Sequence, residues 1–199
     1  MNARDRATPE TWMHPPPDGW TYDQVKGLGL QFNWEFVDGG IVVREMTDWW
    51  HDAVRDKLYL ALMSAMVEPF TANIERCVMV DERTVVKSDI VLFDKRGLDV
   101  HTLDCVPADR VVLAIEVSST GTRPVERFLK PGLYAEAGTG SYWRVERGDG
   151  DVPVVHELSL HAETARNGAP TRERAAHVGT LKTDVPFPVE IDLRDLIEL

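Results

Sequence analysis

Two acidic residues lie inside hydrophobic stretches that are typical of buried β-strands. Asp89 lies within Thr84–Phe93, and Glu116 lies within Val111–Ser119. A lone carboxylate in an apolar strand is costly unless a cation pairs with it. If the two strands are neighbours, their carboxylates come together and repel each other unless a cation lies between them. The pattern therefore predicts a site for a hard divalent ion such as Mg²⁺ between Asp89 and Glu116.

The same pattern also has a simpler structural interpretation. Asp89 and Glu116 would then be strand-end acids whose charges are balanced by lysine and arginine side chains. We favour the metal site, because ionisable residues inside otherwise apolar strands normally mark a functional site.

The elements that must position these acids are those of an α/β chain. Alternating residues and a Gly-containing turn predict a hairpin over 31–45, and helical periodicity predicts a helix from Thr47 or Asp48 to just before Pro69. Pro131 should kink the helical segment that follows residue 122, or start a new helix there. Further strands are expected at 84–93, 110–117, 141–147, 152–160 and 186–191. This order predicts a mixed β-sheet flanked by helices, with an N-terminal β-hairpin.

Length and composition indicate a globular chain. Its 199 residues include 43% hydrophobic and 28% charged side chains, which suits a single domain over residues 1–199 with a peripheral arm at 1–20; two small domains are the alternative. No apolar run approaches the ~20 residues that span a bilayer. Because the N-terminus also lacks an apolar signal segment, we expect a cytoplasmic protein with no membrane partner. Cys77 and Cys105 are too few for a disulfide framework and match no zinc motif, so we expect free thiols.

The charge distribution bears on possible partners. The net charge of −11 argues against broad nonspecific adhesion to DNA, which depends on lysine and arginine. Between Arg110 and Arg147, however, six basic residues outnumber four acidic ones. This locally positive stretch begins at the strand of Glu116, so it could guide a negatively charged substrate there.

The ordered motifs around the two acids resemble the Uma-type restriction endonuclease family, which is part of the PD-(D/E)XK nuclease superfamily. The resemblance extends over roughly residues 20–147 and is carried by Trp34-Glu35-Phe36-Val37-Asp38-Gly39, His51, Lys87-Ser88-Asp89-Ile90, Glu116-Val117-Ser118-Ser119, Lys130, Tyr134-Ala135-Glu136-Ala137-Gly138 and Tyr142-Trp143. It implies a restriction-endonuclease-like core and a Mg²⁺-dependent endonuclease that hydrolyses phosphodiester bonds in DNA.

The resemblance also implies roles for individual residues. Asp89 matches the first acid of the superfamily and Glu116 the second. These two acids and the carbonyl of Val117 would hold one Mg²⁺ or Mn²⁺, with water completing the shell. Ser118 stands where a lysine normally follows the second acid, and Lys130 occupies the position to which the Uma-type family displaces that lysine. Lys130 would orient the attacking water or stabilise the charge that develops on the phosphate; the alternative is a solvated helix lysine. Glu126, where the family usually has aspartate, precedes Lys130 by four residues and could pair with it on one helical face.

Two further residues are candidates for accessory roles. Glu35 would be a third acid near the metal, or an outward-facing residue of the hairpin. His51 would lie in the outer shell of the metal, or would cap the helix or lie on the surface.

Two other functions stay open from the sequence. The fold could serve as a protein-interaction or regulatory module with little or no cleavage, a reading that the acidic composition and the displaced lysine favour. Alternatively, the enzyme could act on RNA or on a small nucleotide. The oligomeric state is also open; a homodimer is the option that analogy suggests, since nucleases of this fold often pair to cut both strands.

Overall fold

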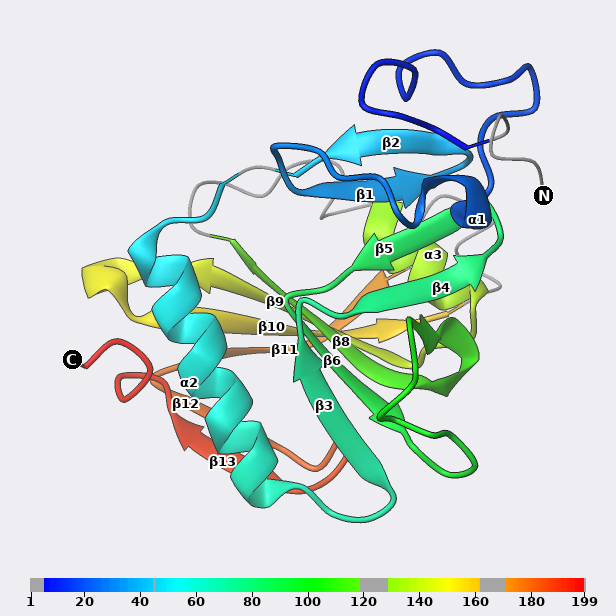
Figure 1. The fold of residues 1–199 in the computed structure, drawn as a ribbon. Helices are drawn as coiled ribbons and strands as arrows, with labels where there is room; N and C mark the ends of the chain where they lie inside the picture. Colours follow the sequence, from blue (N-terminus) through cyan, green and yellow to red (C-terminus); the bar gives the residue numbers. More distant parts are fainter. Residues whose placement is uncertain (1–5, 45, 119–128, 162–170, 199) are drawn as a thin grey trace.

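The computed structural model, which describes residues 6–44, 46–118, 129–161 and 171–198, contains two large β-sheets, one small sheet and one long helix (Figure 1). The helices are α1 (Tyr22–Val25), α2 (Trp49–Ala65) and α3 (Lys130–Glu136), with 3-10 turns at Ala108–Arg110 and Asp149–Asp151. This is the mixed α/β architecture that the order of elements predicts.

The largest sheet has the strand order β11-β10-β9-β8-β6-β3. Its strands are β3 (Phe70–Ile74), β6 (Ile90–Asp94), β8 (Val111–Ser118), β9 (Ser141–Arg147), β10 (Pro153–Leu160) and β11 (Thr171–Val178). Strands β6 and β8 are antiparallel, and Ile90 pairs with Ile115. The next position along this register brings Asp89 opposite Glu116, which confirms the predicted adjacency of the two acids.

Helix α2 packs against this sheet and begins where the sequence predicts. Its N-cap is Asp48, whose side chain accepts a hydrogen bond from the backbone N–H of His51 at 2.9 Å. Leu58 and Leu62 are fully buried in a hydrophobic core that also contains residues of β6, β8 and β9. The small sheet, β12 (Thr180–Thr183) with β13 (Val189–Asp192), contributes to the same core and lies beside α2 (Figure 1).

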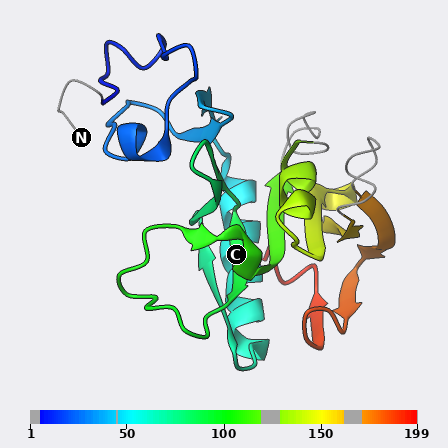
Figure 2. The same ribbon diagram turned by 90° about the vertical axis from the view of Figure 1, so that its right-hand side faces the viewer.

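The second large sheet has the order β2-β1-β5-β4-β7 and contains the predicted hairpin. Its strands are β1 (Trp34–Val37), β2 (Gly40–Val43), β4 (Cys77–Asp81), β5 (Thr84–Lys87) and β7 (Val106–Pro107). The hairpin turn places Asp38 and Gly39 at positive φ, which the Asp-Gly pair tolerates. Figure 2 shows the hairpin and the N-terminal residues gathered at one end of the molecule.

The single strand predicted over residues 84–93 is wrong, because the structure divides it between the two sheets. Strand β5 belongs to the hairpin sheet, β6 belongs to the six-stranded sheet, and Ser88 and Asp89 form the junction. Both junction side chains are buried and hydrogen-bonded: the Oγ of Ser88 lies 2.6 Å from the hydroxyl of Tyr134, and Asp89 accepts the backbone N–H of Val117. The break therefore directs a carboxylate into the space where the two sheets meet.

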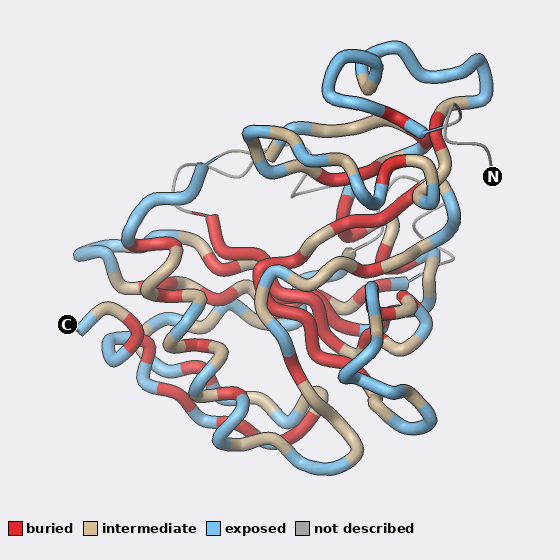
Figure 3. Tube along the Cα trace, in the orientation of Figure 1, coloured by how far each residue is buried: buried red, intermediate tan, exposed pale blue. Residues whose placement is uncertain are grey.

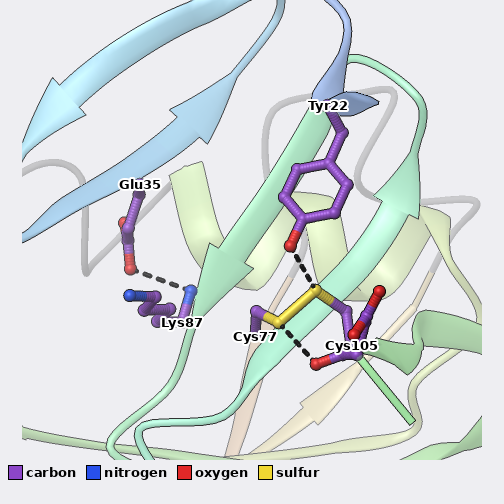
Figure 4. The surroundings of a disulfide bond; sticks show 6 residues. Tyr22, Glu35, Cys77, Lys87 and Cys105 are labelled. Atoms are coloured by element: carbon purple, nitrogen blue, oxygen red, sulfur yellow. Dashed lines mark hydrogen bonds between the residues drawn. A yellow bond between two sulfur atoms is a disulfide. The ribbon is translucent and has the colours of Figure 1, made fainter. Parts of the chain in front are cut away.

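The expectation of free thiols is also wrong, because Cys77 and Cys105 form a disulfide (Figure 4). The two cysteines are 28 residues apart in the chain, but each immediately precedes one of two paired positions, Val78 of β4 and Val106 of β7. Parallel pairing of these strands brings the two Cα atoms to 4.8 Å. A cysteine count does not reveal this proximity.

Burial is concentrated in the central strands. Figure 3 shows red, buried chain along β6, β8 and β9, where strands are covered on both sides. Near-continuous burial of β6 and β8 is the reason that their sequences read as unbroken apolar runs. Within the described residues, no helix is both long and apolar enough to cross a lipid bilayer.

Candidate active site

Asp89 lies at the junction of β5 and β6, and its side chain is only 2% exposed. Its Oδ2 accepts the backbone N–H of Val117 at 2.8 Å and lies 3.1 Å from Nε2 of His51. Its Oδ1 accepts a hydrogen bond from Nη2 of Arg44 at 3.0 Å. Burial acts to raise the pKa of Asp89, but the hydrogen bond and charge of His51 and the charge of Arg44 outweigh it and lower the pKa to about 2. Asp89 is therefore an ionised carboxylate at neutral pH.

Lys130, the first residue of α3, holds two buried carboxylates together. Its Nζ donates to both carboxylate oxygens of Glu116 at 3.0 Å, lies 2.8 Å from Oε1 of Glu35, and donates to the carbonyl of Lys87 at 2.9 Å. The same Oε1 of Glu35 accepts the backbone N–H of Lys87 at 3.0 Å (Figure 4). Lys130 is thus a buried ion-pair partner and not a solvated helix lysine, and Glu35 points inward from the hairpin.

Burial has the largest effect on the pKa of Glu116. Loss of solvation raises its pKa to about 8, although the charge of Lys130 acts to lower it. For Lys130 the balance is reversed: burial acts to lower its pKa, but the charges of Glu116 and Glu35 raise it above its usual range. When Glu116 carries a proton, Glu35 still gives Lys130 a carboxylate partner at 2.8 Å.

The raised pKa of Glu116 predicts a pH dependence of folding stability in the metal-free protein. The folded-state pKa lies above the unfolded value, so the contribution of the protonated form is fully present below pH ~4.5 and is lost as the pH rises through ~8. Between pH 5 and pH 9, the wild type should therefore lose more than about 1 kcal/mol of stability relative to Glu116→Gln. Urea unfolding in the presence of a chelator measures this difference.

The control for this pH experiment is Glu190→Gln, which removes an exposed carboxylate paired with Lys182. Its stability difference from the wild type should stay nearly constant over the same pH range. A Glu116→Gln difference that is flat, or that changes in the opposite direction, would show that Lys130 keeps Glu116 ionised throughout.

His51 connects the site to the first turn of α2. Its Nδ1 lies 3.2 Å from Oδ1 of Asp52, and its Nε2 faces Asp89. Burial acts to lower the pKa of His51, but the hydrogen bonds and charges of Asp89 and Asp52 outweigh it and raise the pKa. The predicted proximity of His51 to the acids is confirmed, and surface exposure is excluded, because its side chain is buried against Asp89.

Tyr134 contacts Ser88, the residue that precedes Asp89 at the junction. It is fully buried on α3, and its hydroxyl lies 2.6 Å from Oγ of Ser88. Burial and the nearby charge of Glu116 raise the pKa of Tyr134, so it stays a neutral phenol. It therefore anchors the junction residue that precedes Asp89 without adding charge.

Arg44 is the functional candidate that sequence reasoning missed. It directly follows β2, and its guanidinium bridges two acids: Nη2 binds Asp89, and Nε lies 3.6 Å from Oε1 of Glu35. Burial acts to lower the pKa of Arg44, but the surrounding carboxylates raise it. The sequence does contain one indication of this role. The hairpin register that points Glu35 inward also places Arg44 at the end of the hairpin, where its backbone N–H donates to the carbonyl of Asn33.

The structure brings together most of the residues singled out from the sequence. His51 contacts Asp89, and Lys130 contacts both Glu35 and Glu116. Arg44 joins these two groups into one network through Asp89 and Glu35. The structure also contains the partners that the simpler interpretation requires, Arg44 for Asp89 and Lys130 for Glu116. Glu126 lies outside the described residues. For Val117 the structure gives a contact of the backbone N–H, so the role of its carbonyl as a metal ligand stays a prediction.

The donor set fits a small, hard divalent ion. In the described part of the chain, no three His, Cys, Asp or Glu side chains are arranged to hold a metal together. An ion at this site would therefore rely on the carboxylates of Asp89 and Glu116, a backbone carbonyl and water. Mg²⁺ is usually bound in this way, through one or two carboxylates with several retained waters.

Comparisons with known proteins bear on the family and the fold of the chain. Residues 21–178 match the model of the Uma2 family, described as "Putative restriction endonuclease". The fold is similar to that of a crystal structure described as a putative nuclease belonging to DUF820 from Anabaena variabilis, with a TM-score of 0.64 and 16% identity over 88% of this chain and 96% of that chain. At this identity the likeness concerns the fold alone. No curated protein matches the sequence.

Proposed function

The chain belongs to the Uma2 family of putative restriction endonucleases, and on that premise we propose that it is a metal-dependent endonuclease that hydrolyses phosphodiester bonds in DNA. One observation carries the proposal. Asp89 from the β5–β6 junction, Glu116 from β8 and Lys130 from α3 belong to one buried network. Its link to Asp89 runs through Arg44 and Glu35. An ionised carboxylate, a second carboxyl group and a cation in one place are the groups that phosphodiester hydrolysis needs.

In this proposal Asp89, Glu116 and the carbonyl of Val117 would hold Mg²⁺ or Mn²⁺. When bound, the ion supplies a water of lowered pKa and polarises a phosphoryl oxygen. Asp89 is already ionised, whereas Glu116 must release its proton to serve as a ligand. The hydrogen bonds from Val117 N–H and His51 hold the Asp89 carboxylate in one orientation.

Lys130 would stabilise the negative charge that develops on the phosphate during attack. Its ammonium is held by Glu35 and by the carbonyl of Lys87, next to the carboxyl group of Glu116 that would hold the ion. The proton on Lys130 stays in place, because two carboxylates raise its pKa. Its role would be electrostatic, without proton transfer.

Nicking of supercoiled plasmid DNA tests the proposed function. The purified wild type should nick DNA with Mg²⁺ or Mn²⁺ and not with a chelator, and Glu116→Gln should lower the rate at least about 100-fold, beyond the loss typical of outer-shell partners. Glu190→Gln should keep the wild-type rate, because that residue lies in an exposed ion pair on β13.

Three results would contradict the proposal. Nicking that survives in Glu116→Gln would point to a contaminating nuclease. Cleavage of single-stranded RNA in place of DNA would keep the chemistry and change the substrate. A wild type that cleaves neither nucleic acid and forms a stable complex with another protein would favour the interaction-module alternative.

A further inference from the structure

We propose that Arg44 is the internal counter-ion of the metal-free site, and that it gives up its place between Glu35 and Asp89 when a divalent cation binds. The proposal rests on the proposed function and adds a residue that controls how tightly the metal binds. It starts from the observation that the carboxylate of Asp89 is already occupied by a cation of the protein itself, at 3.0 Å.

The two cations of the site differ in how they are held. Lys130 is 4% exposed and is surrounded by two carboxylates and a backbone carbonyl. The Arg44 side chain is 16% exposed and makes one short contact, to Asp89, and one longer contact of 3.6 Å, to Glu35. It also extends from the residue after β2 and not from within a strand or helix. Arg44 is therefore the cation that can leave at the lower cost.

Charge balance identifies the same residue. Three carboxyl groups, those of Glu35, Asp89 and Glu116, face Arg44 and Lys130. A divalent ion together with Lys130 would neutralise all three carboxylates. Arg44 would then be a surplus positive charge next to the ion, and the two would repel each other.

His51 does not change this balance. It lies between Asp89 and Asp52, and Asp52 also pairs with Arg55. Arg55 has two further acidic partners, Asp56 and Glu75, so this cluster has enough negative charge to match a protonated imidazole. The exchange therefore concerns the guanidinium alone. Releasing Arg44 costs free energy, and this cost makes metal binding weaker than it would be without Arg44.

Isothermal titration of the chain with Mn²⁺ alone, without nucleic acid, tests the exchange. Arg44→Gln should bind Mn²⁺ at least about fivefold more tightly than the wild type, the lower end of typical coupling between two binding events. Arg96→Gln is the matched control, because it removes the same charge next to Asp94 at the opposite end of β6, and it should bind like the wild type. Arg44→Lys, which keeps a positive charge but cannot bridge two carboxylates, should also bind Mn²⁺ more tightly than the wild type and serves if Arg44→Gln does not fold.

The outcomes separate this inference from the proposed function. If Mn²⁺ binding requires Asp89 but is unchanged or weaker in both Arg44 variants, the exchange is overturned and the metal site stays in place. Arg44 would then only hold the acids in position. No Mn²⁺ binding by any of these proteins would overturn the metal site and the exchange together.

Discussion

Replacing Lys130 with methionine is expected to slow cleavage strongly and to lower the free energy of unfolding by about 3–5 kcal/mol at neutral pH, the cost of breaking a buried ion pair from one side. Methionine fills most of the same space but leaves Glu35 without its buried cation and the carboxyl group of Glu116 without its hydrogen-bond donor. The nicking rate should fall by about 100- to 1000-fold, because a fixed charge at the reacting phosphate is lost. Urea unfolding and plasmid nicking measure the two effects.

The control for this substitution is Lys182→Met. Lys182 pairs with Glu190 at 2.7 Å on the small sheet, and its side chain is 74% exposed. Exposed pairs contribute little, so its effect on stability should stay below about 1 kcal/mol, and cleavage should be unchanged. If Lys130→Met is destabilised but still cleaves at the wild-type rate, Lys130 has a structural role only.

The pairing of the two acids could be predicted from the sequence for a clear physical reason. A carboxylate inside an apolar stretch of sequence has to find a partner, and Asp89 and Glu116 each lie in such a stretch. Antiparallel pairing of β6 with β8 then brings Asp89, immediately before the start of β6, opposite Glu116. The prediction needed only the cost of burying charge, which is a local property of the sequence.

Features that depend on long-range pairing could not be predicted in the same way. The break between β5 and β6 is set by two different sheets, and the apolar pattern continues through it. The Cys77–Cys105 disulfide depends on β4 lying beside β7. Strand β11 (Thr171–Val178) is mostly exposed and polar, so it lacks the alternation that would have predicted it, and it forms through pairing with β10.

The cations around the acids illustrate the same limit. Lys130 was identified through a family resemblance, and no such motif pointed to Arg44. Its role becomes visible only when β2 pairs with β1 and carries the guanidinium to Asp89. A sequence shows that a buried acid needs a partner, but the fold decides which basic residue provides it.

Replacing Asp89 with asparagine is expected to remove Mn²⁺ binding and to reduce cleavage at least about 100-fold while the fold is kept. The amide oxygen of asparagine can still accept the N–H of Val117, but its NH₂ group would face the donors of Arg44. Leaving these donors without an acceptor should lower the free energy of unfolding by about 1–3 kcal/mol. Titration calorimetry, plasmid nicking and urea unfolding measure the three effects.

Acid titration and a matched residue complete this experiment. Because the folded-state pKa of Asp89 is lowered to about 2, its contribution to stability is present above pH ~4 and is lost as the pH falls toward 2, so the deficit of Asp89→Asn should shrink over that interval. Asp94→Asn, at the other end of β6, removes an exposed pair with Arg96 and should leave Mn²⁺ binding and cleavage unchanged. If both variants retained Mn²⁺ affinity, the ion would bind elsewhere and Asp89 would serve only to hold Arg44, His51 and β8 together.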